Sequence, residues 1–150
     1  MKYIIRRLVA VVLLSVLTIG TLQAKRVQVN KIYMFGFAAS FTDTIVHFTN
    51  VQEIDTVWIE SKGHFLLGRD LYSHQLRNYL NEKQMPGRTC VVFYDTKRKK
   101  LEKQFLKMKR LYSQPKDGKN RKRDESHFDV RFLDDGEFKF KNAKISFGDE

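Results

Sequence analysis

The most unusual chemistry in this chain is a run of four cations, Lys97-Arg98-Lys99-Lys100, at the start of a predicted helix. Cations are disfavoured there, because the N-terminus of a helix carries partial positive charge and stabilises acidic side chains. Free backbone N–H groups at a helix start, joined by basic side chains, can surround a phosphate, sulfate or carboxylate. We therefore interpret the run as a candidate anion site, with a solvated basic face, continued by the later Lys and Arg of the helix, as the alternative.

Arg69 is a second candidate for binding an anion, because a guanidinium can hold a carboxylate or phosphate through two parallel hydrogen bonds. It lies in Gly68-Arg69-Asp70, directly before an apolar stripe of helical period. The alternative is that Asp70 caps this helix and that Arg69 pairs with an acidic side chain on the surface. The sequence leaves both interpretations open.

The segment 114–126 (QPKDGKNRKRDES) is the third basic feature. Its only apolar residue is Pro115, so it cannot bury a core, and we expect it to be a mobile loop. It is either an arm that contacts a polyanion or a solvated linker.

Residues of catalytic type form no recognisable motif in this chain. The loop 36–43 has neither the Gly-x-Gly-x-x-Gly spacing nor a Gly-Lys-Ser/Thr sequence, and no Gly-x-Ser-x-Gly elbow is present. The histidines are not paired at i+3 or i+4 and no cysteine pair accompanies them, so we expect no metal and no cofactor. One enzymatic hypothesis stays open, in which strand tips hold a small anionic substrate near Ser40, Asp43, Arg69 and Asp95.

Cys90 is the only cysteine, so no internal disulfide can form. It lies in the apolar run 89–94, where a free thiol behaves as a small hydrophobic side chain. We expect a buried structural thiol and a fold that is held together by its core alone.

The first 24 residues, MKYIIRRLVAVVLLSVLTIGTLQA, follow the pattern of a secretory signal peptide. Basic residues precede an apolar run, and Ala24 is a small residue at a plausible cleavage point. We expect cleavage after Ala24 and a location in the periplasm, in the cell envelope or outside the cell. The alternative is an uncleaved anchor, because an uncharged stretch of this length is at the lower limit for spanning a bilayer. That anchor is the only membrane contact that we expect.

The chain is basic, with 28 Lys and Arg against 17 Asp and Glu and a net charge of +11. Without Lys2, Arg6 and Arg7 of the signal, the net charge is +8. A basic protein attracts anionic partners in general. Outside the cytoplasm these include acidic polysaccharide and lipid headgroups, so we do not expect nucleic acid to be the partner in the cell.

Hydrophobic periodicity predicts two helices. The first follows Asp70 as its N-cap and ends before Pro86-Gly87, and the second follows Asp95-Thr96. Each carries one apolar stripe, formed by Tyr72, Leu76, Tyr79 and Leu80 in the first and by Leu101, Phe105, Met108 and Tyr112 in the second.

Strands are expected at 31–37, 44–49, 55–60, 89–94 and 128–132, although 51–59 could instead contain a helical turn. After a turn at 134–136, Phe138 and Phe140 alternate with lysines and predict the returning arm of a hairpin. The order is then β-β-β-α-β-α-β-β. It indicates an α/β fold, with α+β as the alternative: one domain over 25–150, with a mixed, locally parallel sheet of about five to six strands and two main helices.

Three stretches, KIYMFGFAASFTDT, LLGRDLYSHQLRNYL and RTCVVFY, together resemble small exported proteins of unassigned function from gut Bacteroidetes. The resemblance covers most of the chain up to about Tyr112. It implies an envelope location in a Gram-negative bacterium, and it assigns no catalytic residue.

Together these features predict an exported, non-catalytic domain that binds anionic material or an envelope protein. Its candidate anion ligands are Lys97, Arg98, Lys99, Lys100 and Arg69. The alternative is an enzyme that acts on a small anionic substrate at the strand tips.

Overall fold

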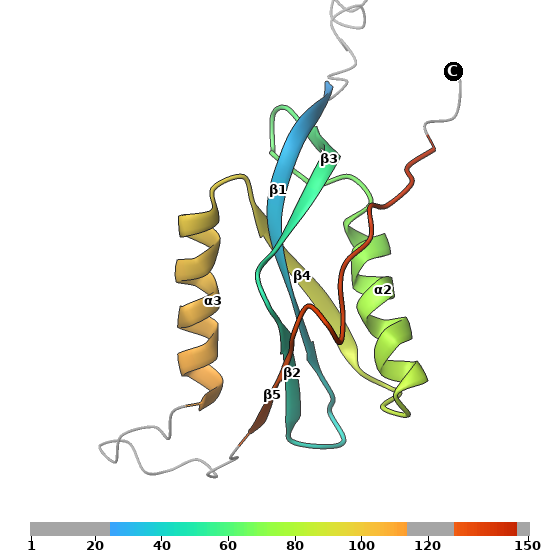
Figure 1. Ribbon diagram of the computed structural model, residues 1–150, viewed down its shortest axis with the longest axis vertical. Coiled ribbons are helices and arrows are strands. Elements are labelled where there is room, and N and C mark those ends of the chain that lie inside the picture. The colour runs from blue at the N-terminus through green and yellow to red at the C-terminus, as the bar shows by residue number, and fades with distance from the viewer. Residues whose placement is uncertain (1–24, 114–127, 147–150) are drawn as a thin grey trace, which may run out of the picture.

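The computed structural model describes residues 25–113 and 128–146 (Figure 1). The expected signal peptide (1–24), its cleavage point after Ala24 and the basic segment 114–126 therefore lie outside the described residues.

One long strand, β1 (Arg26–Ala39), organises the sheet. Along one edge it pairs antiparallel with β3 (Gln52–Glu60) and then with β2 (Ile45–Thr49), and along the other edge with β4 (Thr89–Asp95). β5 (Asp129–Leu133) is the parallel neighbour of β2. β1 is thus the central strand, which explains why its second half is apolar on both faces.

The two helices, α2 (Arg69–Glu82) and α3 (Arg98–Ser113), cover opposite faces of this sheet (Figure 1). On the α2 face the core contains Tyr72, Leu76 and Leu80 packed on β1 and β4. On the α3 face, Leu101 is buried among phenylalanines of β1 and β2, with the rest of its stripe partly buried against them. Both predicted helical stripes are confirmed.

The start of α2 differs from the prediction. Gly68, with φ of 67°, is the N-cap, and no side chain caps the helix. Asp70 lies in the first turn instead, where its negative charge interacts favourably with the partial positive charge of the helix N-terminus. A left-handed backbone at position 68 is accessible to glycine at little cost, so the chain enters the helix through this residue.

The last predicted strand is wrong, because residues 138–146 form no strand. Two glutamine side chains take the place of a partner strand. Gln52 Nε2 donates to the Phe138 carbonyl (2.8 Å) and its Oε1 accepts from Phe140 N (2.9 Å). Gln75 binds the carbonyl and N–H of Lys141 in the same way, at 2.8 Å each. Phe138 and Phe140 are buried beside α2, so the alternation reflects an extended segment with one buried side.

The result is a single small domain with a mixed α+β fold, a five-stranded sheet and the order β-β-β-α-β-α-β. The parallel pairing differs from the expectation: β4 pairs only with β1, antiparallel, and the parallel pair is β2 with β5. Within 25–113 and 128–146, neither helix has the length and apolar character needed to cross a bilayer.

Candidate functional site

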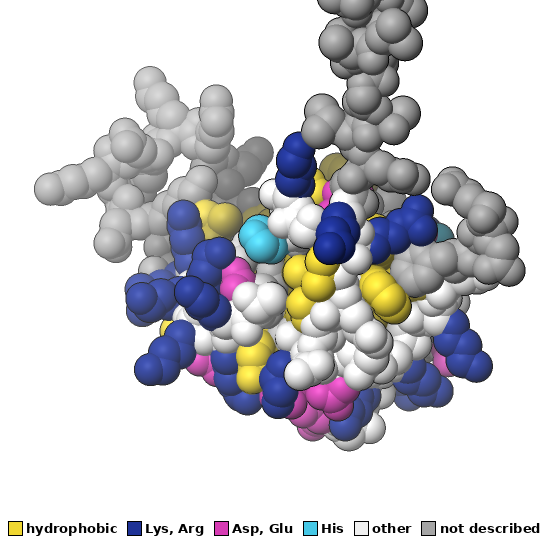
Figure 2. All heavy atoms as spheres, turned by 90° about the horizontal axis from the view of Figure 1, so that it is seen from above, with side chains coloured by type: hydrophobic (Ala, Val, Ile, Leu, Met, Phe, Trp, Pro, Cys, Tyr) yellow, Lys and Arg dark blue, Asp and Glu magenta, His cyan; other side chains and the backbone are white. Residues whose placement is uncertain are grey.

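The outward surface of α3 is the most strongly charged part of the described chain. Leu101 is fully buried, which fixes the opposite side of the helix toward solvent. Lys99, Lys103, Lys107 and Arg110 follow one another at spacings of four, four and three residues, so they lie on one side of the helix and are all exposed. They form a row about 16 Å long, which we call the basic ridge. Figure 2, seen from the end where α3 begins, shows Lys and Arg side chains gathered on the α3 side of the molecule.

Ion pairs neutralise some neighbours of the basic ridge but not its members. Arg98 pairs with Glu102 (2.7 Å) and Lys100 pairs with Asp95 (2.7 Å). Among the described residues, the four cations of the basic ridge take part in no ion pair. Within the described ranges, the four side chains of the basic ridge are therefore exposed cations without an acidic partner.

The helix start itself already contains an anion, the carboxylate of Asp95. Its Oδ1 accepts a hydrogen bond from Lys97 N (2.9 Å), while its Oδ2 pairs with Lys100. Partial burial acts to raise the pKa of Asp95, but the hydrogen bonds from Lys100 and from Lys97 N outweigh it and leave this pKa below its usual value. Of the run Lys97–Lys100, Lys99 is the residue that belongs to the basic ridge.

Arg69 does not join the other predicted anion ligands, because it lies at the start of α2 on the opposite face of the sheet (Figure 1). Its Nη2 donates to the Val92 carbonyl (3.0 Å), and its guanidinium lies 5.8 Å from the centre of the Tyr94 ring. Arg69 thus caps a backbone acceptor of β4. The shallow hollow beside it, about 530 Å³, is wide open to solvent and lined by residues such as Phe65, Asp70 and Ser73.

The residues of the enzymatic hypothesis do not converge. Ser40 follows Ala39, which lies opposite Thr89 at the start of β4, whereas Asp95 is at its other end. Seven strand residues separate these ends by about 20 Å. The Ser40 hydroxyl is hydrogen-bonded to that of Thr42 (2.8 Å). The structure therefore offers no shared pocket for these side chains.

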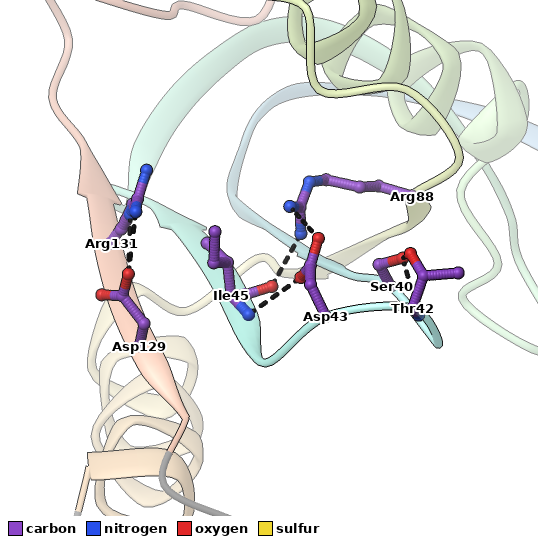
Figure 3. Close-up of polar contacts among 7 residues, drawn as sticks. All are labelled: Ser40, Thr42, Asp43, Ile45, Arg88, Asp129 and Arg131. Atoms are coloured by element: carbon purple, nitrogen blue, oxygen red, sulfur yellow. Dashed lines mark hydrogen bonds and ion pairs between the residues drawn. The ribbon is translucent and has the colours of Figure 1, made fainter.

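A polar cluster at the β1–β2 turn, centred on the buried side chain of Arg88, was not predicted from the sequence (Figure 3). Arg88 Nη2 pairs with Asp43 (2.8 Å), and its Nη1 donates to the Ile45 carbonyl (2.7 Å). His47 is only 2% exposed beside this cluster, and burial, with Arg88 and Arg131 nearby, lowers its pKa to about 4. The contacts of Arg88 hold the β1–β2 turn against the start of β4, so we assign this cluster a structural role. The partners are 45 residues apart, which explains why no local pattern reveals them.

The remaining candidate groups have ordinary roles. Cys90 is buried, as the sequence predicts, and burial raises the pKa of its thiol. No group of three or more His, Cys, Asp or Glu within the described ranges is placed to hold a metal ion. No family model matches the sequence, and neither a curated protein nor a solved structure shows a match.

Proposed function

We propose that this chain is an exported, non-catalytic domain that binds anionic material through the basic ridge of α3. The ridge is rigid, because the other side of α3 is packed on the sheet through Leu101 and Phe105. Export is supported by the pattern of residues 1–24 and by the resemblance to exported proteins of gut Bacteroidetes.

The observation that carries this proposal is the row of four exposed cations, none of which forms an ion pair with another residue of the described ranges. Cations that point the same way add their fields, and an extended anion can contact several of them at once. Such contacts are strongly screened by salt when they are solvent-exposed. A polyanion or the acidic face of an envelope protein has the required charge.

The experiment is a binding titration with dissolved polyphosphate, followed by fluorescence anisotropy, at low ionic strength. The test variant combines three charge reversals on the ridge: Lys99→Glu, Lys103→Glu and Lys107→Glu. We expect it to bind about tenfold or more weakly than the unmodified protein, because each reversal removes one contact and adds a repulsive charge.

A matched control carries the same change in net charge elsewhere, through Lys62→Glu, Lys139→Glu and Lys144→Glu, three exposed lysines that are not on α3. It should retain most of the affinity. Equal losses in both variants would show that only net charge matters and would overturn the ridge as the binding surface.

A further inference from the structure

An exposed leucine lies among the cations of α3. Leu106 is 49% exposed. Lys103 and Lys109 are three residues away on either side, and Arg110 is four residues away, so all three cations are its neighbours on the helix surface. An exposed leucine contributes nothing to the electrostatic binding of a dissolved anion.

The apolar character continues from α3 onto β5. Phe132 is 41% exposed, and Lys109 Nζ lies 4.7 Å from the centre of its ring. Lys109 is thus a neighbour of both Leu106 and Phe132. We call the surface formed by Leu106, Phe132, Lys103, Lys109 and Arg110 the α3–β5 shoulder.

We propose that the α3–β5 shoulder docks on the surface of an anionic lipid bilayer. This inference rests on the proposed function, since Lys103 and Arg110 belong to the basic ridge, and it names the anionic partner. It differs from the sequence-based expectation, which confined membrane contact to an uncleaved N-terminal segment.

The combination of side chains distinguishes a lipid surface from a dissolved polymer. At a bilayer interface, leucine and phenylalanine enter the boundary between headgroups and acyl chains, while long Lys and Arg side chains extend to the anionic headgroups. Each such cation strengthens binding to an anionic leaflet about fivefold. A hydrophilic polyanion would contact the cations alone, whereas a lipid surface would also accommodate the exposed side chains of Leu106 and Phe132.

The test uses the full chain with vesicles of phosphatidylglycerol and phosphatidylcholine in equal parts, and vesicles of phosphatidylcholine alone give the reference. Every variant is compared with the unmodified protein in the same form, so any contribution of residues 1–24 is common to all of them. The test variant is Leu106→Gln, because glutamine favours a helix about as well as leucine. The control is Leu71→Gln, at a 39% exposed leucine of α2.

We expect Leu106→Gln to weaken binding to the anionic vesicles about fivefold or more, since a half-exposed leucine would lose its burial in lipid. Its affinity for polyphosphate should stay unchanged, and Leu71→Gln should affect neither. Thermal unfolding of each variant checks the fold, and Phe132→Thr provides an independent change on β5.

Two outcomes would overturn the lipid inference, and a third would overturn the proposed function. If Leu106→Gln and Leu71→Gln bind the anionic vesicles equally well, or if polyphosphate binding falls as much as vesicle binding, the lipid inference is wrong and the proposed function stands. If the ridge reversals leave polyphosphate binding unchanged, the proposed function fails, and with it the inference built on it.

Discussion

Acidification should destabilise this protein through His47, which is 2% exposed on β2. Burial, together with the charges of Arg88 and Arg131, disfavours the imidazolium form and lowers the pKa of His47 from 6.5 to about 4. In the unfolded chain His47 titrates near 6.5, so the unfolded state binds this proton first as the pH falls. The contribution to stability is therefore fully present above pH 6.5 and is lost as the pH falls toward 4.

The size of the effect follows from the two pKa values. Between pH 7.5 and pH 4.5, the unfolded state gains almost a full proton at His47, while the folded state gains about a quarter of one. Integration over this range gives a loss of about 2–3 kcal/mol in the free energy of unfolding. This loss is a large share of the free energy of unfolding of a typical domain, which is roughly 5–15 kcal/mol.

The assay is urea unfolding at pH 7.5 and at pH 4.5 for the unmodified protein, for His47→Gln and for His74→Gln. Glutamine does not titrate, so His47→Gln should lose about 2–3 kcal/mol less on acidification than the unmodified protein. His74 is an exposed residue of α2, and its variant should behave like the unmodified protein. A His47→Gln variant with the same dependence on pH as the unmodified protein would refute the argument from burial.

Two further predictions concern the packing between α2 and the sheet. Gly36→Ala would place a Cβ 2.7 Å from a methyl group of Leu76, so we expect a loss of about 1–3 kcal/mol in urea unfolding. Leu76→Val in the same chain should recover part of it, and strictly additive losses would contradict the contact. Gln52→Leu would leave the Phe138 carbonyl and Phe140 N–H without their partner, so stability should fall by about 2–4 kcal/mol. The Phe140 amide should then exchange with deuterium much faster, and unchanged exchange would contradict the role of Gln52.

Much of the fold follows from local periodicity. Each helix has one apolar stripe at helical spacing, and β1 and β4 are apolar or β-branched runs. The type and order of these elements can therefore be predicted without knowledge of the sheet. The pairing of the strands cannot be predicted in this way. β3 and β4 flank β1 on opposite edges. The helices α2 and α3 cover opposite faces of the sheet, which separates Arg69 from the cations of α3.

Two of the features that the sequence did not predict have a common physical cause, which is hydrogen bonding by side chains over long sequence separations. Gln52 binds a backbone segment 86–88 residues away, and this replaces the hairpin that the alternation around Phe138 suggests. Arg88 finds Asp43 across 45 residues. Neither contact can be recognised from the local pattern of the sequence, because its partners are far apart in the chain. The basic ridge, by contrast, depends only on helical spacing, and its charges can be recognised once the helix is predicted.

The salt dependence of polyphosphate binding tests the central claim about the basic ridge most directly. The affinity of the unmodified protein and of the variant with Lys99→Glu, Lys103→Glu and Lys107→Glu would be measured between about 50 and 200 mM salt. If the ridge makes the contacts, the slope of log affinity against log salt should be shallower by about 2 in the variant, roughly 0.7 for each contact removed. Equal slopes and equal affinities for the two proteins would contradict the assignment of α3 as the anion-binding surface.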